Sequence, residues 1–186
     1  MLNLFDCEHR HMLNPADCDL GCAVGCVRRG LAFIQKRRVD RKKTLRELII
    51  EEILGARCEL ALKRWIDEHS GVAPIPWTDI LLWGANSRTP DLADDIDVKG
   101  RSLPWHDLLV QEHQPEHFAY VLVFPTVYPT FCIRGWCWGH EAKQTRFWGD
   151  KANNGRPAFF VPQDSGVLRD PDELLELWRQ RAAAFA

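Results

Sequence analysis

Apolar and polar positions recur along this chain with two spacings, which separate helical from extended segments. Over residues 44–68 the apolar side chains recur at helical spacing, and Thr44 followed by Glu47 forms the capping-box pattern that begins a helix. After Pro171, acids followed by arginines predict a last helix over 172–184, because this order of charges suits the helix dipole. The pattern therefore predicts one long helix before the middle of the sequence and a second one near its end.

Shorter apolar segments between these two helices predict β-strands. A strand near 78–83 precedes an acidic hairpin at 90–101, and three further strands are expected near 119–124, 130–138 and 157–162. A helix, then strands, then a helix favours an α/β or α+β fold, in which helices cover a sheet.

Composition narrows the class of protein. Hydrophobic residues are 46% and charged residues 27% of the 186 positions, which is ordinary for a globular chain. No apolar run approaches the roughly 20 residues of a membrane span, and the first residues lack the basic and apolar regions of a signal peptide. We expect a single domain over 1–186, with 1–43 as a Cys-rich and basic N-terminal extension, a cytoplasmic location and no membrane partner.

The acidic hairpin carries the most informative chemistry. Asp97 and Lys99 are separated by one residue, so in a strand their side chains point to the same side, and Asp91 would supply a second carboxylate from the preceding turn. One or two carboxylates typically hold Mg²⁺ together with waters and phosphate oxygens, and a neighbouring lysine can position the attacking water. The alternative is a polar turn followed by an exposed strand.

A third acid lies on the first predicted long helix. Gly55, Leu62 and Ile66 share a helical face with Glu59, so its carboxylate lies on or beside an apolar stripe. A carboxylate in such a place is costly unless a metal ion or an ion pair compensates its charge. The competing explanation is a boundary glutamate that pairs with Lys63, four residues further on.

Three segments together resemble the PD-(D/E)XK nuclease superfamily: a Gly-x-x-x-Glu-x-Ala helix at 55–61, Pro-Asp at 90–91 and Asp-x-Lys at 97–99. The part that carries these motifs covers residues 44–102. The resemblance implies a restriction-endonuclease-like fold, with a central mixed sheet flanked by helices. It also implies a metal-dependent nuclease that hydrolyses phosphodiester bonds, with Mg²⁺ (or Mn²⁺) as cofactor and DNA as the expected substrate.

The resemblance assigns a role to four residues. Glu59, Asp91 and Asp97 would approach the metal ion, and Lys99 would serve the nucleophilic water. The gap between the two aspartates is short, so Asp94 or Asp95 is an alternative first metal ligand. A non-catalytic nucleic-acid-binding module on the same fold is the alternative function, and a protein-interaction or structural protein is a third. A homodimer is one assembly consistent with the resemblance.

The second half of the chain adds another similarity. A Gly-Trp pair at 135–136 and the Pro-Ala-Phe-Phe-Val-Pro segment at 157–162 are similar in order to strands of small phage- and prophage-encoded proteins. In those proteins the two segments follow an acid-x-Lys or acid-x-Arg strand. This similarity supports the same nuclease-like fold.

A basic segment at 28–46 stands out from a net charge of −2. Nine basic residues face one acid, Asp40, and such a cluster can bind the phosphates of a nucleic acid. The alternative is a solvated helix and loop surface. The basic residues are Arg28, Arg29, Lys36, Arg37, Arg38, Arg41, Lys42, Lys43 and Arg46.

The N-terminal segment is rich in cysteine. Cys18, Cys22 and Cys26 would stack along one face of a helix, and with Cys7 and with His9 or His11 they predict a structural Zn²⁺ site or an iron–sulfur site. Reduced, partly buried cysteines are the alternative. Seven cysteines in total is an odd number, which does not indicate a disulfide framework of the secreted type.

Overall fold

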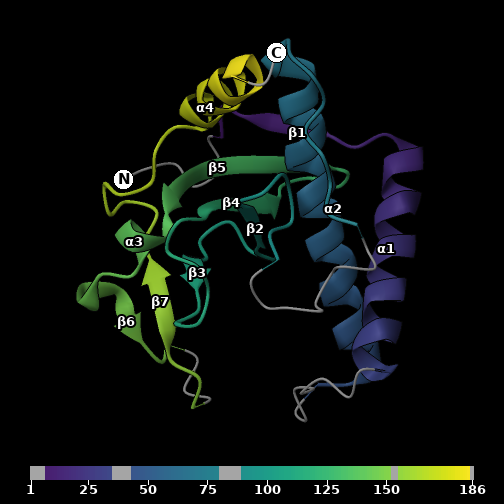
Figure 1. Cartoon of the computed structure of the whole chain (residues 1–186). Coiled ribbons are helices and arrows are strands. Elements are labelled where there is room, and N and C mark those ends of the chain that lie inside the picture. Colours follow the sequence, from purple (N-terminus) through teal and green to yellow (C-terminus); the bar gives the residue numbers. More distant parts are fainter. Residues whose placement is uncertain (1–6, 35–42, 80–88, 152–154, 185–186) are drawn as a thin grey trace.

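The computed structural model describes residues 7–34, 43–79, 89–151 and 155–184. Helices and strands segregate along the sequence, with two long helices before most of the strands and one helix after them (Figure 1). The elements are β1 (Arg10–Met12), α1 (Pro15–Ile34), α2 (Leu45–Ser70), β2 (Ile96–Gly100), β3 (Leu108–Val110), β4 (Ala119–Pro125), β5 (Thr130–Trp138), α3 (Gly139–Ala142), the 3-10 turn η1 (Thr145–Phe147), β6 (Trp148–Gly149), β7 (Ala158–Val161) and α4 (Pro171–Ala184).

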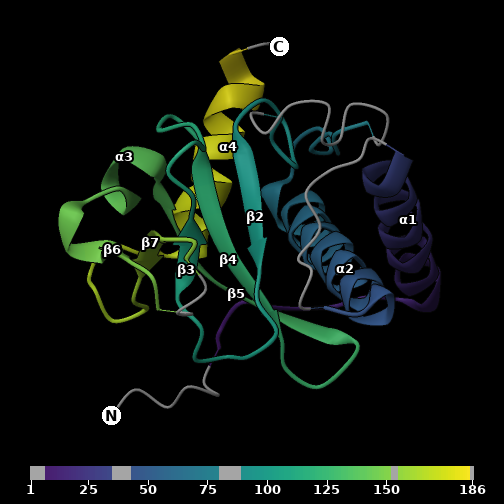
Figure 2. The same ribbon diagram turned by 90° about the horizontal axis from the view of Figure 1, so that it is seen from below.

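The strands form two sheets. The larger is mixed, with the order β1-β5-β4-β2, in which β2 runs parallel to β4 and the other neighbours are antiparallel. The smaller is antiparallel, with the order β3-β7-β6. In the larger sheet β2 is an edge strand, with the long helices α2 and α1 on one side (Figure 2). The protein is therefore an α+β protein with a mixed central sheet.

Two apolar cores lie on opposite faces of the larger sheet. Alternate residues of β4 divide between them: Val121 and Val123 pack with α2, whereas Tyr120 and Leu122 pack toward the smaller sheet. Side chains alternate between faces along a strand, so this division fixes which face each residue of the neighbouring β2 presents.

Glycines bring α1 and β2 close to α2. A Cβ atom at Gly25 of α1 would lie 2.5 Å from the backbone nitrogen of Ile53 in α2. A Cβ atom at Gly100 of β2 would lie 3.2 Å from Sγ of Cys58, also in α2. Helix α2 therefore lies between α1 and the sheet, in contact with the backbone of both.

The predicted elements are largely confirmed. The long helix begins after a Thr44 cap whose capping box with Glu47 is formed, and the last helix and the strands near 119–124, 130–138 and 157–162 are present as α4, β4, β5 and β7. Most of the strand predicted at 78–83 lies outside the described residues. Strands β1, β3 and β6 and the helical form of α1 as far as Ile34 were not predicted. None of the helices that the structure describes is long and apolar enough to span a membrane.

One disulfide joins distant parts of the chain. Cys7, just before β1, is bonded to Cys132 of β5, with 6.0 Å between the two Cα atoms. Strand β1 also pairs with β5, so the bond fixes the N-terminal segment to the sheet next to its own strand partner. The parity of the cysteine count gave no indication of this pair.

Candidate functional site

A short turn holds Asp91 against the outer edge of β2. The amides of Asp91 and Leu92 both donate to the carbonyl of Ile96, at 3.0 and 2.9 Å, and Ala93 adopts a positive φ of 49° inside the turn. The segment before it is fixed in turn, because the amide of Thr78 donates to the carbonyl of Asp91 at 3.0 Å. This turn is the observed form of the predicted acidic hairpin.

The Asp91 side chain contacts the backbone between the two motif residues. Its Oδ2 accepts a hydrogen bond of 2.8 Å from the amide of Val98, which lies between Asp97 and Lys99. An edge strand leaves such amides unpaired by any neighbouring strand, and here a carboxylate takes one of them. The structure thus brings Asp91 next to the Asp-x-Lys motif, as expected from the sequence.

Asp97 and Lys99 form an ion pair on one face of β2. Lys99 Nζ lies in contact with Asp97 Oδ1, and both side chains are largely buried, at 17% and 9% exposure. Oδ1 of Asp97 makes no hydrogen bond in the part of the chain that the structure describes, and the Lys99 ammonium is its ionic partner. The ammonium group of Lys99 also lies 5.3 Å from the ring centre of Tyr120.

Gln114 is a further neighbour of Asp97. Its Nε2 donates to the other carboxylate oxygen, Oδ2, at 3.4 Å, and its own Oε1 accepts from the amide of Gln111 at 2.8 Å. The ammonium of Lys143 donates to the Gln114 carbonyl. These two contacts hold Gln114 in place, so its side-chain amide can orient the Asp97 carboxylate.

Glu59 is held by partners of its own. Arg28 of α1 binds its carboxylate with two nitrogens, one of them at 2.7 Å from Oε2, and both side chains are almost fully buried. The indole nitrogen of Trp77 donates to the same Oε2 at 2.8 Å. The pairing with Lys63 that sequence reasoning considered is wrong, because Lys63 binds Asp67 at 2.6 Å instead.

Glu59 and Lys99 lie on opposite faces of the sheet. Asp97 and Lys99 are in register with Tyr120 and Leu122, which face away from α2, whereas Gly100 faces the helix that carries Glu59. In the described chain, Glu59, Asp91 and Asp97 do not form a cluster with ligand atoms within 4.8 Å of one another. Asp91, at the sheet edge, interacts electrostatically with both Glu59 and Asp97.

The electrostatics of Asp91 reflect this position. Burial raises the pKa of Asp91 well above its ordinary value, and the negative charges of Glu59 and Asp97 raise it further. Lys99 and Arg28 act in the opposite direction and do not compensate. The surroundings therefore disfavour the charged form of Asp91, mainly because its carboxylate is removed from water.

These features fit a hard divalent cation. Mg²⁺ takes oxygen ligands and is commonly held by one or two carboxylates, with waters and phosphate oxygens completing its shell. Asp91 and Asp97 supply two such carboxylates, and Oδ1 of Asp97 is buried without a hydrogen bond. The two carboxylates are therefore the donor set that such an ion would need.

Asp91 differs in its contacts from Asp94 and Asp95, the two alternative metal ligands in this turn. Asp95 is bound by Arg181 of α4, with Nη2 and Oδ2 2.7 Å apart. Asp94 is exposed at the tip of the turn. Of the three acids in this turn, Asp91 is the one whose carboxylate binds the amide of Val98 beside Asp97.

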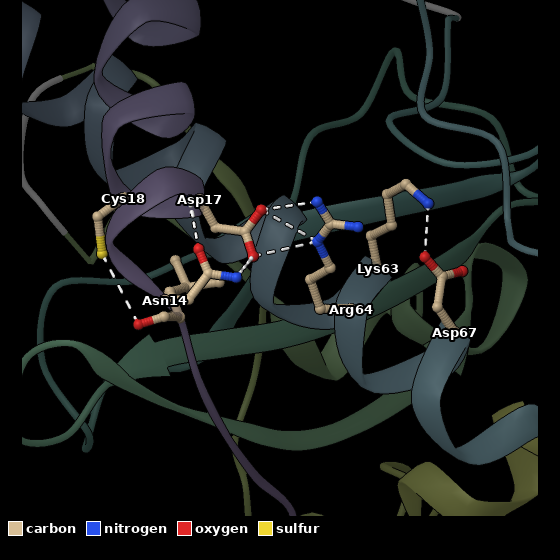
Figure 3. Close-up of polar contacts among 7 residues, drawn as sticks. Asn14, Asp17, Cys18, Lys63, Arg64 and Asp67 are labelled. Atoms are coloured by element: carbon tan, nitrogen blue, oxygen red, sulfur yellow. Dashed lines mark hydrogen bonds and ion pairs between the residues drawn. The ribbon is translucent and has the colours of Figure 1, made fainter.

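The first turn of α1 is tied to α2 by charge (Figure 3). Asp17 accepts hydrogen bonds from Arg64, the shortest at 2.7 Å, and Asn14 at the start of the helix donates to Asp17 at 2.9 Å. The thiol of Cys18 points to the carbonyl of Leu13 at 4.0 Å. This end of the helix is therefore built from satisfied polar contacts.

The residues of the predicted Zn²⁺ site take different positions. Cys7 is bonded to Cys132, while Cys18, Cys22 and Cys26 lie along α1 and change from buried to exposed in that order. The Zn²⁺ site stays a prediction. His11, the other histidine considered for it, is buried and lies 3.4 Å from Glu68.

A separate group of possible metal ligands lies where α4 begins. His9, Asp170 and Asp172 present ligand atoms within 4.8 Å of one another, and both aspartates are exposed. Nε2 of His9 is 3.1 Å from Asp170, and its ring lies edge-on to Trp65. The ion pairs account for this arrangement without a metal ion.

The basic segment at 28–46 divides into inward and undescribed residues. Arg28 and Arg29 are buried in the α1–α2 interface, where Arg29 lies 3.8 Å from Glu52. Lys43 binds Glu51 on α2. The remaining basic residues, apart from exposed Arg46, lie outside the described residues: Lys36, Arg37, Arg38, Arg41 and Lys42.

Comparison of the chain with protein-family models, with curated proteins and with solved structures finds no match. The resemblance to PD-(D/E)XK nucleases therefore rests on the motif residues of the sequence.

Three residues that contact the predicted site residues, Arg28, Trp77 and Gln114, were not predicted from the sequence to be its neighbours. Trp77 and Gln114 carry no motif, and Arg28 was assigned to a phosphate-binding cluster. One signal for Arg28 was present: Gly21 and Gly25 precede it on one face of α1, and small residues at this spacing allow two helices to approach closely. A long side chain one turn further along that face then reaches across the interface.

Proposed function

We propose that this protein is a Mg²⁺-dependent nuclease that hydrolyses phosphodiester bonds, with DNA as its substrate. The observation that carries the proposal is the arrangement at the outer edge of β2. There the Asp91 carboxylate binds the amide of Val98, and Asp97 and Lys99 flank that amide on one face of the strand. Two carboxylates and one amine in this arrangement are the groups that metal-assisted phosphodiester hydrolysis requires.

Each residue has a role that follows from its contacts. Asp91 and Asp97 would hold the metal ion, which would lower the pKa of a coordinated water and stabilise charge on the phosphoryl group. Lys99 positions the attacking water and offsets the negative charge that develops on the phosphate. Gln114 is a positioning residue, because it contacts Asp97 and is itself fixed by its own turn.

Glu59 acts on the site through its charge. Arg28 and Trp77 occupy its carboxylate, so it is a tuning residue and not a direct ligand in this arrangement. Its negative charge contributes to the raised pKa of Asp91 and therefore to the attraction for a cation. This role is the one that the contacts of Glu59 support.

The proposal is tested by cleavage of a supercoiled plasmid and of a linear duplex with Mg²⁺ or with EDTA. Wild-type protein should cleave only with the metal ion. Lys99→Met should reduce the rate by about 10²–10⁴-fold, the range for a positioned proton-transfer group. Asp97→Asn, which removes a metal ligand, should also reduce the rate. Asp94→Asn is the matched control, because it removes an exposed acid from the same turn and should leave cleavage unchanged. Cleavage that survives both site variants would reject the assignment.

A specific observation favours a second candidate, a non-catalytic nucleic-acid-binding module on this fold. The carboxylate of Glu59 is engaged by Arg28 and Trp77, which leaves two acids where the resemblance implies three. Such a module would bind DNA in a salt-dependent manner and would cleave it with no divalent ion. The plasmid assay with Mg²⁺ and with Mn²⁺, run beside a binding assay, separates the two candidates.

A further inference from the structure

A cavity opens between the first half of α2 and the end of β2. Its volume is about 630 Å³, and its wall contains Gly100 and Arg101 directly after Lys99. His106 lines it from the loop before β3, and Ile50 and Leu54 of α2 supply apolar wall. The cavity is therefore continuous in sequence with the strand that carries the proposed catalytic groups.

Arg101 makes no ion pair with another described residue of this wall. Its Nε is buried and makes no hydrogen bond within the described residues, although the residue as a whole is partly exposed. Burial lowers the pKa of the guanidinium, against the weaker effect of Asp107. Asp107 is itself bound by Lys151. An arginine whose buried Nε is unsatisfied within the described residues can offer that donor to an anion in the cavity.

The acids in the same wall are already engaged. Glu51 is bound by Lys43, and Glu47 closes the capping box by accepting from Thr44, at 2.7 Å from the backbone amide. Neither carboxylate makes a contact with Arg101. The groups left to meet a ligand at this end of the cavity include the guanidinium of Arg101, the hydroxyl of Ser102 and the imidazole of His106.

Arg101 also continues the line of catalytic groups. Its amide donates to the carbonyl of Val123 at 2.9 Å, which extends the β2–β4 ladder by one residue. Arg101 follows Lys99 two residues further along the chain, a step of about 6–7 Å where the extended geometry of β2 continues. This spacing is comparable to the distance between neighbouring phosphates of one nucleic-acid strand.

From this geometry we infer that the Arg101 cavity binds a backbone phosphate of the nucleic acid, next to the phosphate that is cleaved. The guanidinium supplies a two-pronged donor to the phosphate oxygens, which suits arginine better than lysine. The contact positions the strand across Asp97 and Lys99 and carries no base specificity. The inference rests on the proposed nuclease function and names the residue that holds its substrate.

The test measures binding of a fluorescein-labelled DNA duplex in EDTA over a range of salt concentrations, so that no cleavage can occur. Arg101→Gln should weaken binding and reduce the slope of log K against log salt by about 0.9, the value of one phosphate contact. Arg146→Gln is the matched control, because Arg146 is an exposed arginine on η1. It removes the same charge and should leave the slope unchanged. The midpoint of thermal unfolding should not fall in Arg101→Gln, since the buried Nε makes no hydrogen bond within the described residues that would be lost.

The outcomes separate this inference from the proposed function. An unchanged slope in Arg101→Gln, or a slope that falls equally in both variants, overturns the phosphate contact. A lowered unfolding midpoint with an unchanged slope assigns Arg101 a structural role and also overturns it. If the slope changes as expected but wild-type protein does not cleave with Mg²⁺, the phosphate contact stands and the nuclease proposal fails. If wild-type protein cleaves with Mg²⁺ and the slope is unchanged in Arg101→Gln, the nuclease proposal stands and the phosphate contact fails.

Discussion

Two regions of this protein bury charged side chains, and they do so in opposite ways. In the α1–α2 interface each buried acid meets its own base: Arg28 binds Glu59, and Arg64 binds Asp17. At the outer edge of β2, Asp91 and Asp97 share one lysine, Lys99, and one carboxylate oxygen has no hydrogen bond among the described residues. In the interface each acid has its own base, whereas at the strand edge two acids share one base.

This difference distinguishes charges that maintain the fold from charges that await a ligand. A paired buried ion is costly to break but does nothing further once it is satisfied. An unbalanced group of acids reduces stability unless something else compensates it, so a fold that retains one is expected to use it. The comparison predicts that substitutions in the interface damage stability and that substitutions at the strand edge damage function.

The largest effect on stability should come from separating the interface pair. Arg28→Met leaves the Glu59 carboxylate buried without its main partner and should lower the free energy of unfolding by about 3–5 kcal/mol. The double variant Arg28→Met with Glu59→Leu should recover much of that loss, because it removes both charges. Urea unfolding followed by circular dichroism measures both variants. A single variant as stable as wild type would contradict the paired description of the interface.

The close approach of α1 to α2 gives the next largest effect. Gly25→Ala puts a Cβ atom against the backbone of Ile53 and should destabilise by about 1–3 kcal/mol, as overpacking does. Gly30→Ala is the control on the same helix, because no atom lies within 4 Å of the added Cβ. It should be neutral or stabilising by up to about 1 kcal/mol, since alanine is the better helix former. Equal effects of the two alanines in thermal unfolding would show that the helices are not in backbone contact.

At the strand edge the expected sign is reversed. Asp91→Asn removes a charge that burial and two neighbouring acids disfavour, while its side-chain oxygen can still accept from the amide of Val98. In metal-free buffer it should raise the unfolding midpoint by about 2–4 °C, which corresponds to roughly 1 kcal/mol in a chain of this size. Asp95→Asn is the contrast, because it breaks the pair with Arg181 and should lower the midpoint. A fall in both variants would mean that Asp91 is structural.

The smallest effect concerns a matched pair at the surface, Glu141 with Arg169. The hydrogen bonds from Arg169 hold the pKa of Glu141 below its ordinary value. The folded-state value is the lower one, so the stabilisation is present above the ordinary pKa and is lost as pH falls through the folded value. Glu141→Gln should therefore cost up to about 1 kcal/mol near neutral pH and nothing at acid pH, because the pair is partly exposed.

Urea unfolding at several pH values measures this difference. Glu173→Gln is the control, since Glu173 approaches Arg169 only to 4.0 Å and is largely exposed. It should show little dependence on pH. A cost of Glu141→Gln that persists at acid pH would show that the ion pair is not its cause.

Local patterns predicted the parts of the molecule that local forces determine. The cap at Thr44 and the spacing of apolar residues gave α2, and the one-residue separation of Asp97 and Lys99 gave their common face. Partners far apart in sequence were not predictable in this way. Arg28 meets Glu59 across 31 residues, and the disulfide joins Cys7 to Cys132 across 125, because tertiary packing alone brings them together.

The face of Glu59 shows most clearly what a motif cannot determine. Its helical stripe correctly predicted a buried carboxylate that needs compensation, and left open whether a metal ion or an ion pair provides it. The answer depends on α1, whose glycines let Arg28 reach across, and on the Trp77 indole. The sequence pattern of a site therefore predicted which residues are unusual, while their partners followed from the fold.

The most direct test of the account is a crystal structure of the protein soaked with Mn²⁺, recorded at a wavelength where manganese scatters anomalously. The account predicts one strong anomalous peak at the outer edge of β2, bound by carboxylate oxygens of Asp91 and Asp97, and its loss in Asp97→Asn. A peak at His9, Asp170 and Asp172 with none at the strand edge would contradict the proposed metal site.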